Sequence, residues 1–196
     1  MLIIVLYVDD LMLTGDDQLI MSCKEDLARE FEMKDMGLMH YFLGMEVWQK
    51  DGELFVSQGK YANEILRRFH MEKCKPMQTP LAGNWRKEVA TSREVVGATM
   101  YKNLVGSLMY LMNTCPDLCY ALNHLSQVMV QHTNMYWKAE KHVLRYLRGT
   151  SQYGLWYRQT KGVKLQGFTD ADWVGSPSDQ KSTLGGIFNL GSAVVS

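Results

Sequence analysis

Two adjacent carboxylates interrupt an apolar run near the start of the chain. Asp9 and Asp10 lie between residues 2–8 and 11–14, which are rich in β-forming side chains. Because burying an unpaired carboxylate is costly and Asp tolerates turn conformations, the pattern predicts a tight hairpin with both acids at its tip. Such a tip could hold divalent cations for two-metal phosphoryl transfer, since Mg²⁺ binds a few carboxylates together with phosphate oxygens. The alternative is a hairpin that uses the two acids only as its turn.

A second candidate set is basic. The segment 135–148 has apolar residues at helical spacing, and it carries four cations spaced three, four and three residues apart, which share one helix face. This face is either an ordinary solvated surface or a stripe that follows nucleic-acid phosphates through salt-sensitive contacts. An earlier predicted helix at 60–71 offers Lys60, Arg67 and Arg68 in a similar way. The four cations of the first set are Lys138, Lys141, Arg145 and Arg148.

A third candidate lies near the end of the chain. Asp170 and Asp172 alternate with apolar neighbours, so a strand would point both carboxylates to one face. The simpler interpretation is an edge strand with a charged outer face. The four cysteines lack the second close pair that a zinc site needs, so we expect reduced thiols.

The composition indicates what can position these residues. A chain of 196 residues with 46% hydrophobic side chains can build a packed core. Lys+Arg and Asp+Glu balance at 21 each, so nucleic-acid binding would need a local patch. No apolar stretch is long enough for a membrane span, and the first residues lack a cleavable leader pattern. We therefore expect an intracellular, non-secreted protein, cytoplasmic or nuclear, with no membrane partner.

The predicted elements follow from turn and periodicity signals. After the first hairpin, Asp16 or Asp17 can cap a helix, and Asp51-Gly52 predicts a second hairpin within 40–58. Residues 74–96 have little periodicity and are expected to form a long connection. Helices are predicted at about 98–112, 116–130 and 135–148, the last stopped by Gly149, and strands separated by turns follow.

An ordered series of short motifs covers essentially the whole chain and resembles the Pol polyprotein of copia-type LTR retrotransposons. "YVDD" alone, the catalytic motif of reverse transcriptases, would be weak evidence; the series is specific. It consists of "YVDD" at 7–10, "FEMKDMG" at 31–37, "YFLGMEV" at 41–47, "YKNLVGSLMYL" at 101–111, "PDLCYALNHLSQ" at 116–127, "WKAEKHVLRYLRGT" at 137–150 and "GFTDADWVGSPSDQKST" at 167–183.

The resemblance implies an α+β chain in three parts. Residues 1–58 would be the C-terminal part of a reverse-transcriptase palm, including a primer-grip-like second hairpin. Residues 59–150 would be a mainly helical thumb and connection, and residues 151–196 the first strands of an incomplete RNase H-like sheet. By the same resemblance, Asp9 and Asp10 are the catalytic, metal-binding pair. Tyr7 and Val8 line the turn near the primer end, and Asp170 is the first metal-binding acid of RNase H.

The resemblance also implies cofactors and partners. The parent enzyme would use Mg²⁺ or Mn²⁺, an RNA/DNA template-primer duplex and dNTPs. It would act with the rest of the Pol polyprotein, in a cytoplasmic virus-like particle. The third palm carboxylate precedes the "YVDD" motif in the family, so we expect this chain alone to be an inactive polymerase fragment. The alternatives are a non-catalytic nucleic-acid-binding remnant and the translation of a degenerate element with no function. We also expect the apolar face of residues 2–6 to lie exposed and to promote aggregation.

Overall fold

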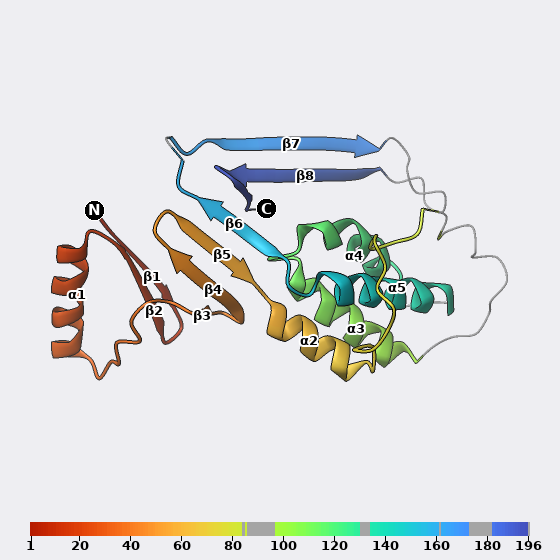
Figure 1. Cartoon of the computed structure of the whole chain (residues 1–196), viewed down its shortest axis with the longest axis horizontal. Helices are drawn as coiled ribbons and strands as arrows, with labels where there is room; N and C mark the ends of the chain where they lie inside the picture. Colours follow the sequence, from red (N-terminus) through yellow and green to blue (C-terminus); the bar gives the residue numbers. More distant parts are fainter. Residues whose placement is uncertain (84, 86–96, 130–133, 161, 173–181, 196) are drawn as a thin grey trace. The chain divides into compact units, whose positions relative to one another are not determined.

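The computed structural model describes residues 1–83, 85, 97–129, 134–160, 162–172 and 182–195. The chain divides into two compact units, Met1–Met39 and His40–Ser196 (Figure 1). Each unit is a mixture of helix and strand, as the sequence predicts.

The first unit is a hairpin followed by one helix. Strands β1 (Leu2–Tyr7) and β2 (Asp10–Gly15) pair antiparallel, and α1 (Asp17–Glu30) follows. The side chain of Asp16 caps α1 by accepting from two backbone amides of its first turn, at 3.1 and 3.4 Å. This N-cap confirms one of the two that the sequence predicts.

Burial is low throughout this first unit. No residue of Met1–Met39 is buried, and the apolar side chains of β1 are exposed, among them Ile4 at 50% and Leu6 at 67%. The exposed apolar strand agrees with the expectation for residues 2–6. A two-stranded hairpin is at best marginally stable in water, so this unit has little packing of its own to hold it.

The second unit contains a four-stranded antiparallel sheet in the order β3, β4, β5, β6. The predicted turn at Asp51-Gly52 joins two of its strands, and Gly52 has the positive φ of 73° that glycine tolerates. The last strand differs from expectation, because it pairs with β5 and not with the strands that follow it. The strands are β3 (Tyr41–Phe42), β4 (Met45–Lys50), β5 (Glu53–Ser57) and β6 (Gly154–Arg158).

Helices form the core of this unit. The cluster of buried side chains comes from α2, α3, α4 and α5, and the Tyr101 hydroxyl crosses it to donate to the Leu125 carbonyl at 2.8 Å. A 3₁₀ turn, Pro116–Leu118, leads into α4. The helices are α2 (Gly59–Arg68), α3 (Ala98–Leu111), α4 (Cys119–Ser126) and α5 (Asn134–Thr150).

Gly149 does not end the last of these helices, so that prediction is wrong. Helix α5 continues to Thr150, whose hydroxyl donates to the carbonyl of Tyr146 at 3.1 Å. A Cβ added at Gly149 would lie 3.2 Å from the Pro76 side chain. The glycine therefore allows the connecting segment to pass close to the helix. The predicted connection has no helix or strand at residues 74–83, and residues 84 and 86–96 lie outside the described part of the chain.

A three-stranded antiparallel sheet ends the chain. Its strands are β7 (Leu165–Asp172), β8 (Thr183–Leu190) and β9 (Ala193–Val194). The Tyr157 hydroxyl donates to the Val194 carbonyl at 2.8 Å, which links β6 to this sheet. Among the described residues, no helix is long and apolar enough to cross a membrane.

The pairing of strand β6 crosses the boundary that the sequence suggests near residue 150. The strand follows residue 150 in the chain, but it pairs with β5, which precedes residue 150. The chain divides into its two compact units between residues 39 and 40. The three-part division at 58 and 150 stays a prediction about the parent enzyme.

Candidate functional site

The two acids of the first hairpin occupy different positions at its tip. Val8 and Asp9 form the turn, and Asp10 is the first residue of β2, where it pairs with Tyr7. The sequence places both acids in the turn, but the turn lies one residue earlier and only Asp9 belongs to it. The reason is the register: Tyr7 opposite Asp10 leaves room for a two-residue loop, the commonest hairpin connection.

The backbone of this turn is strained at Val8. Its φ is +52°, in the left-handed region that a β-branched residue rarely adopts. Both common two-residue hairpin turns need a positive φ at their first central position, and glycine or asparagine usually provides it. Strain of this kind tends to occur where a turn has a function.

Both carboxylates are exposed, and carboxylate oxygens are the donors that Mg²⁺ and Mn²⁺ prefer. Asp9 and Asp10 therefore fit a divalent cation in donor type. Among the described residues, no three His, Cys, Asp or Glu side chains cluster as a metal site would require. The tip of this hairpin thus presents two adjacent carboxylates, fewer than the three groups of such a cluster.

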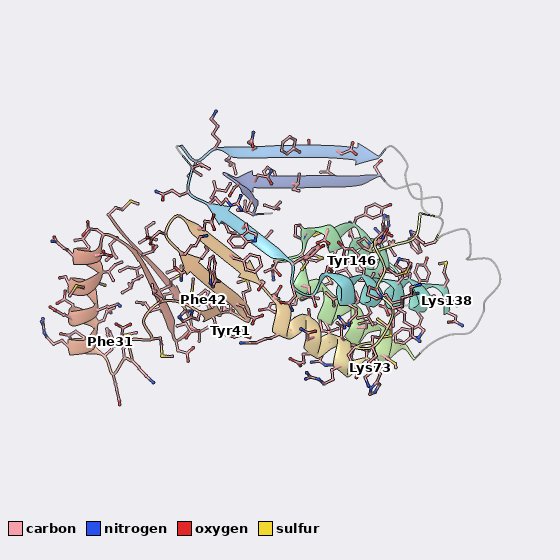
Figure 2. The ribbon with its side chains drawn as sticks, viewed as in Figure 1. Phe31, Tyr41, Phe42, Lys73, Lys138 and Tyr146 are labelled. Atoms are coloured by element: carbon pink, nitrogen blue, oxygen red, sulfur yellow. The ribbon has the colours of Figure 1, made fainter. Side chains whose placement is uncertain are left out.

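The basic stripe of α5 is divided between two roles. Lys138, labelled in Figure 2, and Lys141 are both exposed. The Lys141 ammonium lies 5.2 Å from the centre of the Trp137 ring. Arg145 and Arg148 each donate through Nε to a backbone carbonyl of the segment 72–75, at 2.8 and 2.7 Å. The two lysines are thus available to a ligand, while the two arginines also hold the connecting segment against the helix.

The earlier helix contributes fewer available cations. Arg68 pairs with Glu64 at 2.6 Å, and Lys60 lies 3.5 Å from Glu46. These contacts neutralise part of the basic charge that the sequence places on α2.

Asp170 lies in the middle of β7, opposite Gly185 of β8. It is exposed, and its carboxylate accepts from the backbone amide of Ala171 at 2.9 Å. The described residues bring no acidic cluster to it. The part of its motif at 173–181 lies outside the described residues.

Sequence reasoning missed a buried acid. Glu140 of α5 is fully buried, and neither carboxylate oxygen has a hydrogen-bond partner among the described residues. Burial raises its pKa to about 9, so the folded form keeps its proton at neutral pH. The signal was in the sequence, because Glu140 follows Tyr136 by four residues and precedes Val143 by three, within the apolar face of the helix.

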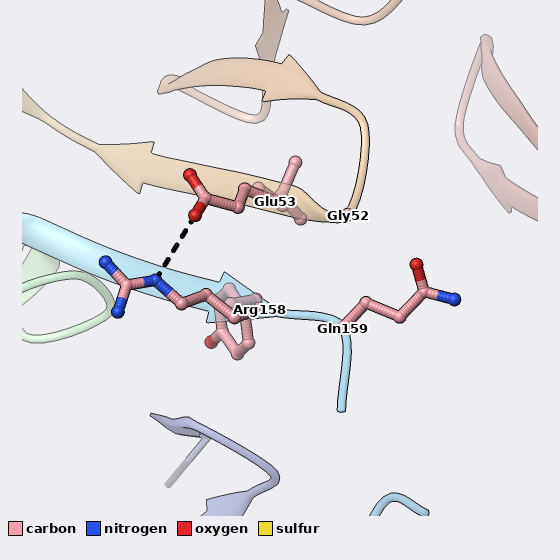
Figure 3. A pocket seen from close by; sticks show the side chains of 6 residues that line it. Gly52, Glu53, Arg158 and Gln159 are labelled. Atoms are coloured by element: carbon pink, nitrogen blue, oxygen red, sulfur yellow. Dashed lines mark ion pairs between the residues drawn. The ribbon is translucent and has the colours of Figure 1, made fainter. Parts of the chain in front are cut away.

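An open hollow of about 310 Å³ lies where β5 begins and β6 ends. Figure 3 shows its ion pair, in which Arg158 Nε lies 3.4 Å from Glu53. Glu53 also pairs with Lys50 at 2.9 Å. This end of the sheet therefore has two cations around one carboxylate.

The four cysteines are unpaired, as predicted, and only Cys115 is buried. Burial raises the pKa of the Cys115 thiol. The pKa of the partly buried Cys119 thiol is raised for the same reason. Neither thiol is thereby activated as a nucleophile.

Comparison with known families gives a match in the first part of the chain. Residues 1–83 match the family described as "Reverse transcriptase (RNA-dependent DNA polymerase)". This range contains the hairpin with Asp9 and Asp10, α1 and the β3–β5 part of the four-stranded sheet. No solved structure matches the chain.

Comparison with curated proteins finds relatives that cover nearly all of the chain. It is 39% identical to the retrovirus-related Pol polyprotein from transposon RE2 of Arabidopsis thaliana, over 97% of this chain and 13% of that protein. It is 38% identical to the Pol polyprotein from transposon TNT 1-94 of Nicotiana tabacum, over 15% of that protein. An uncharacterized mitochondrial protein of Arabidopsis thaliana is 38% identical over 98% of this chain and 80% of its own length. The chain thus spans about one seventh of the length of these Pol polyproteins.

Proposed function

The chain belongs to the reverse transcriptases of copia-type, retrovirus-related Pol polyproteins from transposons, and from this we propose that it carries the catalytic hairpin of an RNA-directed DNA polymerase. The observation that supports this most is the exposed Asp9-Asp10 pair at the tip of an apolar hairpin, inside the range that matches the family. In the proposal these two acids are catalytic, and Tyr7 and Val8 line the primer end.

The two carboxylates would hold Mg²⁺ or Mn²⁺, which, when bound, supplies charge stabilisation for phosphoryl transfer. The residues of this chain contribute position. Pairing with Tyr7 of β1 positions Asp10, and the turn at Val8 places Asp9 beside it. The template-primer duplex, the dNTPs and the rest of Pol are the partners that the proposal requires.

The finer division of the chain is part of the same proposal. Residues 1–58 would belong to the palm, 59–150 to the thumb and connection, and 151–196 to the start of RNase H, with Asp170 as its first metal-binding acid. The chain alone should not polymerise, because its described residues gather two carboxylates where the mechanism needs more. Template-dependent incorporation by the purified chain, abolished by Asp9→Asn, would overturn this expectation of inactivity.

Metal binding tests the acid pair itself. Titration with Mn²⁺, followed by paramagnetic broadening of backbone amide signals, should broaden residues 8–11 first. The variant D9N/D10N should lose this broadening. Asp16 and Asp17 provide a matched control, because they are also adjacent and exposed, and D16N keeps a capping side chain. Equal broadening at both acid pairs would contradict the proposed metal site.

A second candidate function is non-catalytic binding to a duplex through α5. It is favoured by the exposure of Lys138 and Lys141 on one helix face. Binding of an RNA/DNA hybrid should weaken steeply with salt and should be lost in K138E/K141E. The control K34E/K164E makes the same charge change at two other exposed lysines. An equal loss of duplex binding in both variants would indicate a general effect of net charge, and would rule out binding through the basic face of α5.

A further inference from the structure

Residues 72–79 lie along one face of α5, and we call them the strap. Three side chains of α5 each contact a backbone carbonyl oxygen of the strap, and they are spaced three residues apart, as neighbours on one helix face are. Because the contacts run in opposite orders along the two segments, the strap is antiparallel to the helix. The contacts are Arg148 to Glu72 at 2.7 Å, Arg145 to Lys75 at 2.8 Å and His142 to Thr79 at 3.0 Å.

Polar contacts, and not burial, hold the strap in place. No residue of the strap is buried. Besides the three side-chain contacts, the Met77 amide donates to the Arg145 carbonyl at 3.2 Å. The chain on either side is anchored differently, because Met71 and Leu81 pack against the helical core. A segment with exposed hydrogen bonds and anchored ends can open locally without disturbing the core.

A helical glycine allows the strap to lie this close to α5. A Cβ added at Gly149 would lie 3.2 Å from the Pro76 side chain, closer than ordinary van der Waals contact. Gly106 of α3 is also helical, but among the described residues an added Cβ there meets nothing within 4 Å beyond its own helix backbone. Alanine at these two positions changes helix propensity alike, but only at Gly149 does it press on the strap.

The strap occupies hydrogen-bond donors that a phosphate would use. An arginine binds a phosphate most firmly through a planar fork of two N–H groups, and Nε is one prong of its side-on fork. In Arg145 and Arg148 a strap carbonyl takes this prong. Neither arginine forms an ion pair within the described residues. Their charge is therefore available to an anion, but their best donors are in use while the strap is closed.

We propose that the strap is an autoinhibitory contact, in which its carbonyls and the phosphates of a ligand compete for Arg145 and Arg148. With the strap lifted, the two arginines join Lys138 and Lys141 in one four-cation stripe. This inference rests on the second candidate function, duplex binding through α5, and adds its regulation. Linkage makes the competition reciprocal: the strap weakens the ligand by the factor by which the ligand opens the strap.

A reversible crosslink tests the competition. The variant P76C/G149C places two thiols on Cβ atoms about 3.2 Å apart, close to the roughly 3.5–4.5 Å that a disulfide spans. The additional change C74S removes a neighbouring thiol that could form the wrong pair. The oxidised protein has its strap held closed and the reduced protein can open it, so each preparation is its own control.

The salt dependence of RNA/DNA hybrid binding should differ between the two states. The logarithm of the affinity falls with the logarithm of the salt concentration by about 0.9 for each phosphate contacted. We expect a slope of about −3.6 for the reduced protein, from four cations, and about −1.8 for the oxidised protein, from Lys138 and Lys141 alone. The oxidised protein should also bind more weakly. Equal slopes in the two states would overturn the proposal.

Hydrogen exchange of the Met77 amide measures strap opening without a nucleic acid. Inorganic tripolyphosphate should speed this exchange in the unchanged chain as its occupancy rises, and should have no effect on oxidised P76C/G149C. G149A should speed the exchange without any ligand, because its methyl group displaces Pro76, while the matched control G106A should not. Unchanged or slower exchange in tripolyphosphate would mean that strap and phosphate do not compete, and would overturn the proposal.

The autoinhibitory contact and duplex binding can fail separately. If the hybrid binds neither state of P76C/G149C, duplex binding through α5 is wrong, and Met77 exchange in tripolyphosphate still decides whether the strap competes with phosphate. If K138E/K141E loses the hybrid while the two crosslink states give equal slopes, duplex binding stands and the autoinhibitory contact is wrong.

Discussion

The hairpin unit and the helical core differ in how much of each is buried. Nothing in Met1–Met39 is buried, and β1 exposes a row of large aliphatic side chains. In the second unit, Leu104, Leu108 and Leu144 lie among side chains with almost no exposed surface. The acids proposed for catalysis therefore lie in the least buried part of the molecule, and most of the stability lies elsewhere.

This difference separates stability from the proposed chemistry. A two-stranded hairpin with an exposed apolar strand gains little from its own packing. Asp9 and Asp10 would therefore be held more firmly if the exposed apolar side chains of β1 were covered. The exposed edge of β1 is where another strand could pair. Substitutions in the two units should consequently have very different effects on unfolding.

The largest effect is expected in the core. Leu108→Ala removes a fully buried side chain of α3 and should lower the free energy of unfolding by about 2–5 kcal/mol. Ile4→Ala shortens a side chain of β1 that is 50% exposed, and should lower the free energy of unfolding by less than about 1 kcal/mol. Urea unfolding followed by near-ultraviolet circular dichroism measures both. Equal losses would mean that β1 is part of a buried core after all.

The next effect concerns the buried acid of α5. The pKa of Glu140 is raised from 4.5 to about 9 in the folded chain, so between these pH values the unfolded state loses a proton that the folded state keeps. Stability should therefore fall as pH rises through this window, by about 1.4 kcal/mol per unit and roughly 3 kcal/mol by pH 7. Glu140→Leu should recover about this amount at pH 7.

Glu140→Gln provides the control for charge. It keeps the shape and a polar end, so it should abolish the pH dependence between 5 and 9 while recovering less stability than leucine. Parallel urea titrations of the three proteins across this range measure the difference. A Gln variant with the same pH dependence as the unchanged chain would show that another group is responsible.

The smallest effect concerns the strained turn of the hairpin. Val8→Gly should stabilise the turn by about 1 kcal/mol, because glycine adopts a φ of +52° without a steric penalty. Val5→Gly, in the extended part of β1, should instead weaken pairing. Amide hydrogen exchange in β1 and β2 reports both changes. Lower protection in the Val8 variant would contradict the strained geometry.

Local features of the fold could be predicted from sequence. The Asp16 cap, the Asp51-Gly52 turn and the span of α3 follow from signals within a few residues. The pairing of β6 with β5 could not be predicted, because a period of two identifies a strand but not its partner about 100 residues away.

The candidate site divides in the same way. Asp9 and Asp10 were found from their place in an apolar run, and only the register moved Asp10 from the turn into β2. Helical spacing found the basic face of α5, but it could not indicate that Arg145 and Arg148 also bind backbone carbonyls of the connection. Trp48 and Phe55 are paired within the β4–β5 hairpin, but Trp156 joins them only through the pairing of β6 with β5, which the sequence does not indicate.

The central claim is that Asp9 and Asp10 of this chain are polymerase acids. The most direct test replaces the matching segment of the Arabidopsis RE2 Pol polyprotein, which is 39% identical over 97% of this chain, with residues 1–196. Primer extension on an RNA template with Mg²⁺ is then measured for the chimera and for its D9N and D16N variants. We expect extension by the chimera and by D16N, and a loss of at least a hundredfold in D9N. Extension by D9N at the level of D16N would contradict the claim.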